Sequence, residues 1–161
     1  MLDLRAADPD VLVLVGTQTG NAERVADALA DRLGDLGFAA HVLDLAEAYP
    51  EVLEEHRQVV AVTCTWSDGT FPDNAVAFAE SLESLDLDLG HLGFGVCGLG
   101  DRDYDPFYQT AAYRLRDLLA ERGATEAAPV HAIDGGPTAG DVDGARAWVE
   151  TLAAAFAGPP T

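Results

Sequence analysis

The sequence contains no lysine, and its nine arginines stand against 28 acidic residues, for a formal net charge of −19. This balance argues against nucleic acids and anionic membranes as partners, because both are recognised by basic surfaces. The acidic residues are spread along the whole chain, which favours a halophilic surface adapted to high salt. An acidic docking face for a basic partner protein is the alternative.

Long apolar runs and cysteines are also scarce. No run approaches the roughly 20 residues of a membrane-spanning helix, and no secretory signal is recognisable, so we expect a cytoplasmic protein. Only Cys64 and Cys97 carry thiols, and we expect both to be reduced and buried. The four histidines lack metal-ligand spacing, so no metal site is predicted. The length of 161 residues predicts one domain, 1–161, and we expect a monomer.

The most informative stretch begins with the apolar run Val11–Val15, which ends at Gly16. Such a run before a turn predicts a strand buried on both faces of a parallel sheet. The hydroxyls of Thr17 and Thr19, with the backbone N–H groups of the turn, would surround an anion at a helix N-terminus, and phosphate is the expected guest. The pattern G-x-G-x-x-G is absent from this loop, and G-x-x-x-x-G-K-[ST] requires a lysine. Neutral donors without a cation suit a phosphate monoester.

Strand-like and helix-like patterns alternate five times along the chain. Strands are predicted at 11–15, 38–43, 59–63, 92–97 and 128–133, with amphipathic helical patterns after them. This alternation predicts an α/β fold with a parallel sheet covered on both faces. The polar and glycine-rich segments follow the first, third and fourth strands, whose carboxyl ends converge where ligands bind in such sheets.

Two aromatic residues lie in these segments rather than in an apolar stripe. Trp66 follows the third strand and Tyr104 follows the fourth. Beside a phosphate site they would stack on both faces of a flat ring. The alternative is that both side chains only plug the loops against the core.

Three motifs carry a resemblance to a known family: GTQTGNAE at Gly16–Glu23, TWSDGTFPDNA at Thr65–Ala75 and GLGDRDYDPF at Gly98–Phe107. The chain resembles flavodoxins, and among them the FMN-binding domains of diflavin reductases such as sulfite reductase flavoprotein. The resemblance covers about Val11 to Phe156. It implies a three-layer, doubly wound, five-stranded parallel sheet of order 2-1-3-4-5, for which flavodoxin with its FMN is a standard example.

The resemblance also implies a set of FMN-binding residues. The phosphate would be held by Thr17, Gln18, Thr19, Gly20, Asn21 and Ala22. The isoalloxazine would lie between Trp66 and Tyr104, with Thr65, Ser67, Asp68 and Gly69 along its edge. Its pyrimidine end would meet Leu99, Gly100 and Asp101, and Phe107 and Asp134 complete the set.

The chain departs from the family pattern at two of these positions. Ala22 replaces a threonine that is frequent in flavodoxins, so the phosphate shell has one hydroxyl fewer. Ser67 stands where the family usually has glycine, and a positive φ costs serine more than glycine. We therefore expect a less stable one-electron-reduced flavin. No long insertion splits the fifth strand, which is typical of the short-chain form.

The resemblance implies a carrier that binds FMN non-covalently and shuttles electrons between redox partners, a reductase donor and an acceptor enzyme. Whether the chain is itself an enzyme stays open. One alternative is an FMN-dependent quinone or nitro reductase, which stacked aromatics on both ring faces would obstruct. Another is the flavin module of a reductase whose NADPH-binding part is a separate chain. A signalling receiver is rejected, because that module needs a lysine.

Overall fold

The structure is a computed structural model that describes residues 10–16, 20–64, 73–100, 109–135 and 137–157. Its strands are β1 (Asp10–Gly16), β2 (Ala39–Asp44), β3 (Gln58–Cys64), β4 (Gly93–Gly100), β5 (Thr125–Glu126) and β6 (His131–Asp134). Its α-helices are α2 (Asn21–Asp35), α3 (Asp73–Ser84), α4 (Thr110–Glu121) and α5 (Ala139–Ala157). Two short 3-10 helices, η1 (Leu45–Glu47) and η2 (Pro50–Glu55), connect β2 to β3.

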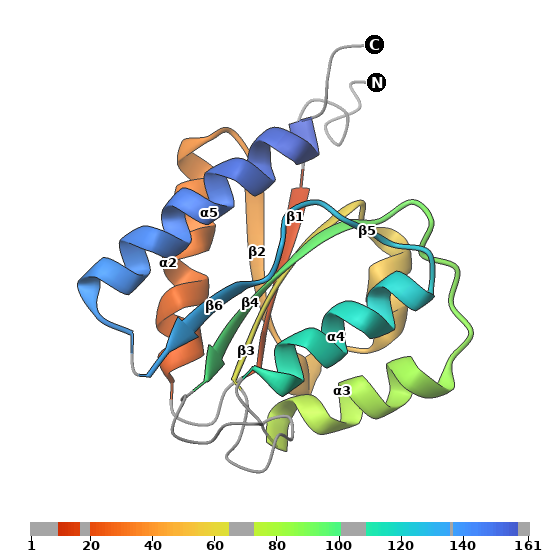
Figure 1. Cartoon of the computed structure of the whole chain (residues 1–161). Helices are drawn as coiled ribbons and strands as arrows, with labels where there is room; N and C mark the ends of the chain where they lie inside the picture. Colours follow the sequence, from red (N-terminus) through yellow and green to blue (C-terminus); the bar gives the residue numbers. More distant parts are fainter. Residues whose placement is uncertain (1–9, 17–19, 65–72, 101–108, 136, 158–161) are drawn as a thin grey trace.

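The strands form one parallel sheet in the order β2-β1-β3-β4-β5, and β6 also pairs with β4. Helices α2 and α5 cover one face of this sheet, and α3 and α4 cover the other (Figure 1). The three-layer, doubly wound fold and the strand order predicted from the sequence are therefore confirmed. Among the described residues, no helix combines the length and apolarity needed to cross a membrane.

The apolar run of β1 supplies side chains to both layers of the core. Val11, Val13 and Val15 belong to the cluster packed under α2 and α5. Leu12 and Leu14 belong to the cluster packed under α3 and α4. All five are at most 3% exposed, and each such buried side chain contributes about 1.5–3 kcal/mol to folding. The sequence-based prediction of a strand buried on both faces is confirmed.

Helix α2 follows β1 and ends in a well-defined cap. Its apolar stripe includes Val25, Leu29 and Leu33, each fully buried. The amide of Phe38 donates to the carbonyl of Leu33 at 3.0 Å, and the amide of Gly37 donates to Gly34 at 3.1 Å. Gly37 has φ 96°, the left-handed conformation that this cap requires and that glycine adopts at little cost. The helix thereby returns the chain to the start of β2.

The fifth position of the sheet differs from the prediction of one strand at 128–133. The structure has β5 and β6 there, separated by residues 127–130. In the pair Phe94–Glu126 the two partners are 32 residues apart in the sequence, and in the pair Cys97–His131 they are 34 residues apart. Two extra residues therefore bulge out of the ladder, and Pro129, which has no N–H to donate, lies in this bulge.

Helix α5 begins with a capping box. The amide of Thr138 donates to Asp141 Oδ2 at 2.9 Å, and the amide of Asp141 donates to Thr138 Oγ1 at 3.1 Å. The helix then buries Ala145, Val149 and Leu152 against the sheet. This reciprocal pair satisfies two backbone donors that a helix start otherwise leaves open.

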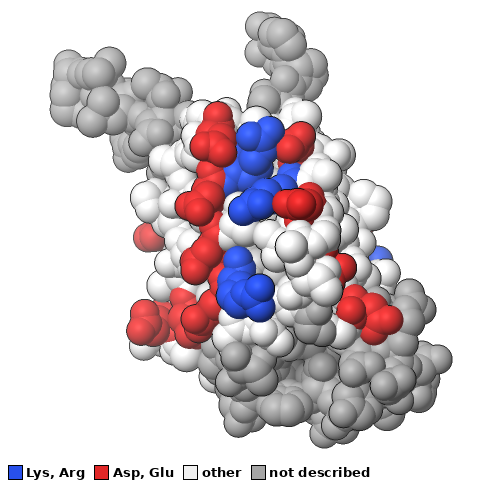
Figure 2. Space-filling view, turned by 90° about the vertical axis from the view of Figure 1, so that its left-hand side faces the viewer, with Lys and Arg blue, Asp and Glu red and all other residues white. Residues whose placement is uncertain are grey.

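Several arginines on the face formed by α2 and α5 are paired with acidic residues. Arg32 Nε lies 3.0 Å from Glu150 Oε2, which joins α2 to α5. Arg146 lies 3.1 Å from Asp143. Figure 2 shows this face, with the arginines gathered in its middle and acidic residues beside them. Cationic side chains here are thus partly neutralised within the chain.

Candidate functional site

The carboxyl ends of four neighbouring strands lie at one edge of the sheet. In the register of the sheet, Gly16 of β1 lies opposite Thr63 of β3, and Cys64 lies opposite Leu99 of β4. Gly100 lies opposite Asp134 of β6. These ends point the same way in Figure 1. The three segments singled out in the sequence all start from this edge, as the position of ligand sites in parallel sheets predicts.

Six of the predicted FMN-binding residues lie in the described part of the chain: Gly20, Asn21, Ala22, Leu99, Gly100 and Asp134. The others lie outside it: Thr17, Gln18, Thr19, Thr65, Trp66, Ser67, Asp68, Gly69, Asp101, Tyr104 and Phe107. The six described residues form two groups, one at the start of α2 and one at the ends of β4 and β6. The sheet register brings the second group together, since Gly100 and Asp134 are direct partners.

The start of α2 has the features of an anion site. Gly20 precedes the helix with φ 87° and carries no side chain that could cap it. An α-helix leaves the N–H groups of its first turn without intrahelical acceptors, here those of Asn21, Ala22 and Glu23. The helix dipole adds partial positive charge at the same point. This donor set fits a phosphate held without a cation, although the Glu23 carboxylate in the first turn opposes it.

Gly16 fixes the strand end from which the predicted phosphate loop departs. A Cβ at this position would lie 3.0 Å from Ala75 Cβ of α3 and 3.0 Å from Leu45 Cδ1 of η1. It would also lie 3.1 Å from the hydroxyl of Thr63. All three distances are tighter than most real Cβ contacts, so a side chain at this position would force these neighbours to move by a few tenths of an ångström.

Besides the glycines Gly20 and Gly100, two more of the six residues can act only through their backbones. The side chain of Ala22 is fully buried in the core cluster under α2 and α5. The side chain of Leu99 lies in the same cluster and is 4% exposed. Position 22, where flavodoxins frequently have threonine, therefore lies in the packed core. Both residues can offer a ligand their N–H or carbonyl groups alone.

The ends of β4 and β6 are joined by a short backbone hydrogen bond. The amide of Gly135 donates to the carbonyl of Gly100 at 2.7 Å. Gly135 has φ 82°, so the chain turns here in a conformation that favours glycine. The backbone of Leu99 and Gly100, which the resemblance assigns to the pyrimidine end of the flavin, is thereby tied to Asp134.

One residue at this edge, Gln109, was not predicted from the sequence. It precedes α4, is fully buried and has φ 62°, although it is not glycine. Its Nε2 donates to the carbonyl of Ile133 at 3.0 Å. The only signal in the sequence was indirect: Gly98 and Gly100 lie two apart, on the same face of one strand, and together leave room for a side chain.

The family model described as Flavodoxin matches residues 13–148. The chain belongs to the flavodoxin family. Members of this family bind FMN and transfer electrons, so the domain is a flavodoxin-like FMN domain. The described donors at the start of α2 fit the phosphate of FMN.

Some proteins similar to this chain are much longer flavoproteins. The sulfite reductase [NADPH] flavoprotein alpha-component of Thiocapsa roseopersicina is 36% identical over 116 residues, which are 70% of this chain and 22% of that protein. The chain thus spans about a fifth of the length of such curated relatives.

Solved flavodoxins match it nearly from end to end. A short-chain flavodoxin associated with a non-canonical PDU bacterial microcompartment is 26% identical, with a TM-score of 0.81, and the match covers 89% of this chain and 96% of that one. A mutant flavodoxin from Pseudomonas aeruginosa is 28% identical, with a TM-score of 0.83 and coverage of 92% and 99%.

Proposed function

We propose that this flavodoxin acts as a one-domain electron carrier, 1–161, that exchanges electrons with a separate reductase and an acceptor enzyme. The observation that carries the proposal is the start of α2, where a side-chain-free Gly20 opens the helix N-terminus at the carboxyl end of β1. The match to 96% of a solved flavodoxin supports a carrier of one domain. Bound FMN supplies the redox chemistry, and the protein binds, orients and shields it.

In this proposal the described residues divide the work on FMN between two places. The N–H groups of Asn21 and Ala22 bind the phosphate at the start of α2. The backbone of Leu99 and Gly100 contacts the pyrimidine end of the ring. The resemblance assigns the two ring faces to Trp66 and Tyr104, which lie outside the described residues.

A matched pair of glycine substitutions tests the phosphate site. Gly20 has φ 87° and Gly37 has φ 96°, and among the described residues no neighbouring atom lies within 4 Å of a Cβ added at either position. Alanine at either position costs about 1–2 kcal/mol of backbone strain. Gly20→Ala is expected to weaken FMN binding and to leave riboflavin, which lacks the phosphate, bound as in the parent protein. Gly37→Ala, at the far end of α2, is expected to bind both flavins normally.

Two results would argue against the phosphate site. One is equal loss of FMN and riboflavin affinity in Gly20→Ala, which would show that the substitution does not act through the phosphate. The other is equal loss of FMN affinity in both glycine variants, which would reduce the effect to lower stability. Isothermal titration of each folded variant with each flavin distinguishes these cases.

The alternative is a flavin module whose NADPH-binding part is a separate chain. It differs from the proposed carrier in its partner and not in its flavin chemistry. The relatives named as NADPH-dependent sulfite reductase flavoproteins are about five times longer than the matched segment, which supports testing it. NADPH added alone is expected to leave the bound flavin oxidised. Adding a separate NADPH-dependent flavodoxin reductase is expected to bleach it. Bleaching by NADPH alone would favour the quinone or nitro reductase alternative.

The proposal extends to the state of the protein in the cell. We propose a monomer in the cytoplasm of an organism or compartment with high salt. The reduced thiols of Cys64 and Cys97 support a reducing compartment. The net charge of −19 supports the halophilic assignment. Sedimentation in about 1 M salt, where the Debye length is about 3 Å, tests the monomer without long-range charge repulsion.

A further inference from the structure

Gln109 combines two features that destabilise a fold. Its φ of 62° is the one left-handed backbone among the described non-glycine residues. Its Oε1 is buried, and it is the one buried side-chain nitrogen or oxygen atom of the described residues that has no hydrogen-bond partner. Left-handed backbone and an unsatisfied buried acceptor both cost free energy, and such costs collect where function requires them.

The rest of the Gln109 side chain joins three elements. It precedes α4, and its Nε2 donates to the carbonyl of Ile133 in β6 at 3.0 Å. It also lies against β4, because a Cβ added to Gly98 would collide with Oε1 of Gln109 and with Ala112 Cβ. A Cβ added to Gly100 would lie 3.2 Å from the amide nitrogen of Gln109. Glycine at both positions makes the space that this side chain fills.

Gly100 is therefore held from two directions. Gln109 packs against its Cα on the side of α4, and the amide of Gly135 donates to its carbonyl at 2.7 Å on the side of β6. Because Gln109 also binds Ile133, the same side chain fixes β6 relative to β4. The position of the Gly100 peptide thus depends on Gln109.

We propose that Gln109 is a positioning residue for the flavin ring, which it serves by fixing the Leu99–Gly100 backbone against β6. The inference rests on the proposed function, since it assigns that backbone to the pyrimidine end of FMN. Gln109 acts on the ring and not on the phosphate, because the start of α2 belongs to the other group of site residues. Its substitution therefore weakens FMN and riboflavin binding by the same factor, unlike Gly20→Ala.

The test compares Gln109→Met with Leu118→Ala. Methionine keeps the length of the side chain and removes its hydrogen bond. Leu118 is a buried residue of the same helix, and its truncation destabilises α4 while sparing the tie to β6. Both variants are titrated with FMN and riboflavin at a temperature where each is fully folded, and the visible circular dichroism of the bound flavin is recorded.

Gln109→Met is expected to bind both flavins at least about tenfold more weakly, and with altered flavin dichroism. Leu118→Ala is expected to keep both affinities within about twofold of the parent, a difference of about 0.4 kcal/mol. Gln109→Gly, which suits the left-handed backbone, serves as the second variant and is expected to match Gln109→Met.

Three results would overturn the proposal. Parent-like flavin affinity in Gln109→Gly or Gln109→Met would show that the contacts of Gln109 do not affect binding of the flavin ring. Equal losses in Leu118→Ala would reduce the effect to general stability. Failure of both Gln109 variants to fold would make the residue purely structural. Absence of FMN binding by the parent protein would instead refute the proposed function, so the two failures are distinguishable.

Discussion

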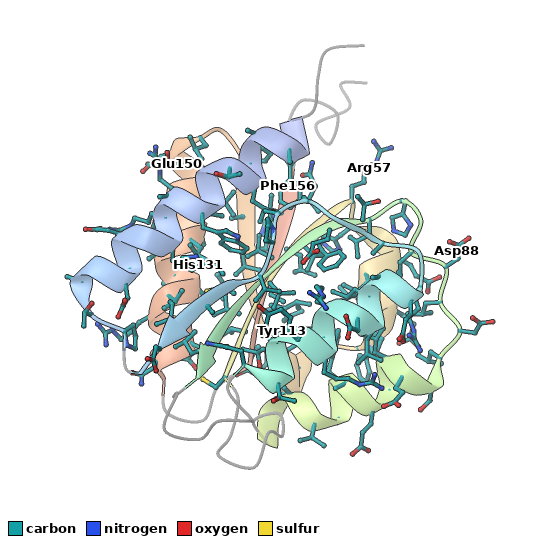
Figure 3. The ribbon with its side chains drawn as sticks, in the orientation of Figure 1. Arg57, Asp88, Tyr113, His131, Glu150 and Phe156 are labelled. Carbon is teal, nitrogen blue, oxygen red and sulfur yellow. The ribbon has the colours of Figure 1, made fainter. Side chains whose placement is uncertain are left out.

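The imidazole of His131 stacks on the indole of Trp148, with ring centroids 5.7 Å apart and ring planes inclined by 26°. Trp148 Nε1 also donates to the carbonyl of Pro129 at 2.9 Å, so the indole of α5 holds both the bulge and the strand that follows it. His131 is the first residue of β6, and its side chain lies on the side of the strand that faces α5 (Figure 3). Aromatic pairs of this kind contribute about 0.5–1.5 kcal/mol beyond the area they bury.

The stacked His131 makes the stability of the protein depend on pH. Burial lowers the pKa of His131 below the ordinary value of 6.5, and the charge of Asp141 offsets this only in part. The folded chain therefore binds the proton less readily than the unfolded chain. The stabilisation that neutral His131 gives the fold is complete above its unfolded-state pKa. This stabilisation is lost as the pH falls below that value towards the lower folded-state pKa.

Urea titrations between about pH 5 and 8, the range in which histidine changes charge, measure this dependence. The free energy of unfolding is expected to fall on the acidic side. The variant His131→Phe keeps a stacked ring without a titrating group, so its stability should vary less with pH. Identical pH profiles in the two proteins would contradict the assignment to His131.

Cys97 is predicted to be unreactive in the folded protein. Burial raises the pKa of its thiol to about 12, with a smaller contribution from Cys64. In the variant Cys64→Ala, the remaining thiol should resist iodoacetamide at about pH 8, near the ordinary cysteine pKa, until denaturant is added. The matched variant Cys97→Ala leaves the partly exposed Cys64, which should react in the folded state. Mass spectrometry of the alkylated chains would reveal the opposite order if burial does not protect Cys97.

Local chemistry explains which parts of this fold the sequence predicts. The apolar run at 11–15 is a local pattern, and the strand that it predicts is present. The capping box of Thr138 and Asp141 is also a local contact, between residues three apart in the sequence. The two-residue bulge before His131 depends on Trp148, which is distant in sequence and binds Pro129. The predicted burial of both thiols holds fully for Cys97, while Cys64 at a strand end is partly exposed. Contacts between distant segments are not encoded in local periodicity.

The capping box at the start of α5 should contribute measurably to stability. Removing the hydroxyl in Thr138→Ala is expected to cost about 1 kcal/mol, because the amide of Asp141 loses its acceptor. Thr138→Ser keeps the acceptor and should cost much less. Equal thermal midpoints for the two variants would show that the cap observed at Thr138 contributes nothing.

The acidic surface should make the fold depend on salt. At about 0.01 M salt the Debye length is about 30 Å, and at about 1 M it is about 3 Å. Repulsion among the acidic residues is therefore strong only at low salt, and the thermal midpoint of apo and FMN-bound protein should rise across this range. A midpoint that stays flat or falls would favour the acidic docking face instead.

A pair of triple variants assigns the salt effect to unpaired acids. Glu47, Glu51 and Glu55 are exposed and take part in no ion pair among the described residues. Replacing all three with glutamine should raise the midpoint at low salt and flatten its salt dependence. The control replaces three acids that pair with arginines, Glu83, Asp143 and Glu150, and should lower the midpoint or leave it unchanged. The same response in both triples would contradict this account.

The location of the candidate site was predictable from the sequence, but the residue that packs behind it, Gln109, was not. Gly16, Gly20 and Gly100 were identified because motifs place them after strands. Gln109 escaped because a polar residue before a helix gives no hint of full burial or of a positive φ. Its partners Gly98 and Ile133 lie 11 and 24 residues away in the sequence, and only the packed sheet brings them to it. Tertiary packing overrides local propensity at this point.

The most direct test of the account is the flavin content of the purified protein. After reconstitution with FMN in about 1 M salt, where charge repulsion is screened, the folded protein should show visible flavin absorption with quenched fluorescence. Denaturation should then release intact FMN in an amount close to one per chain, as non-covalent binding requires. A protein that is folded yet retains no FMN at any salt concentration would contradict the account.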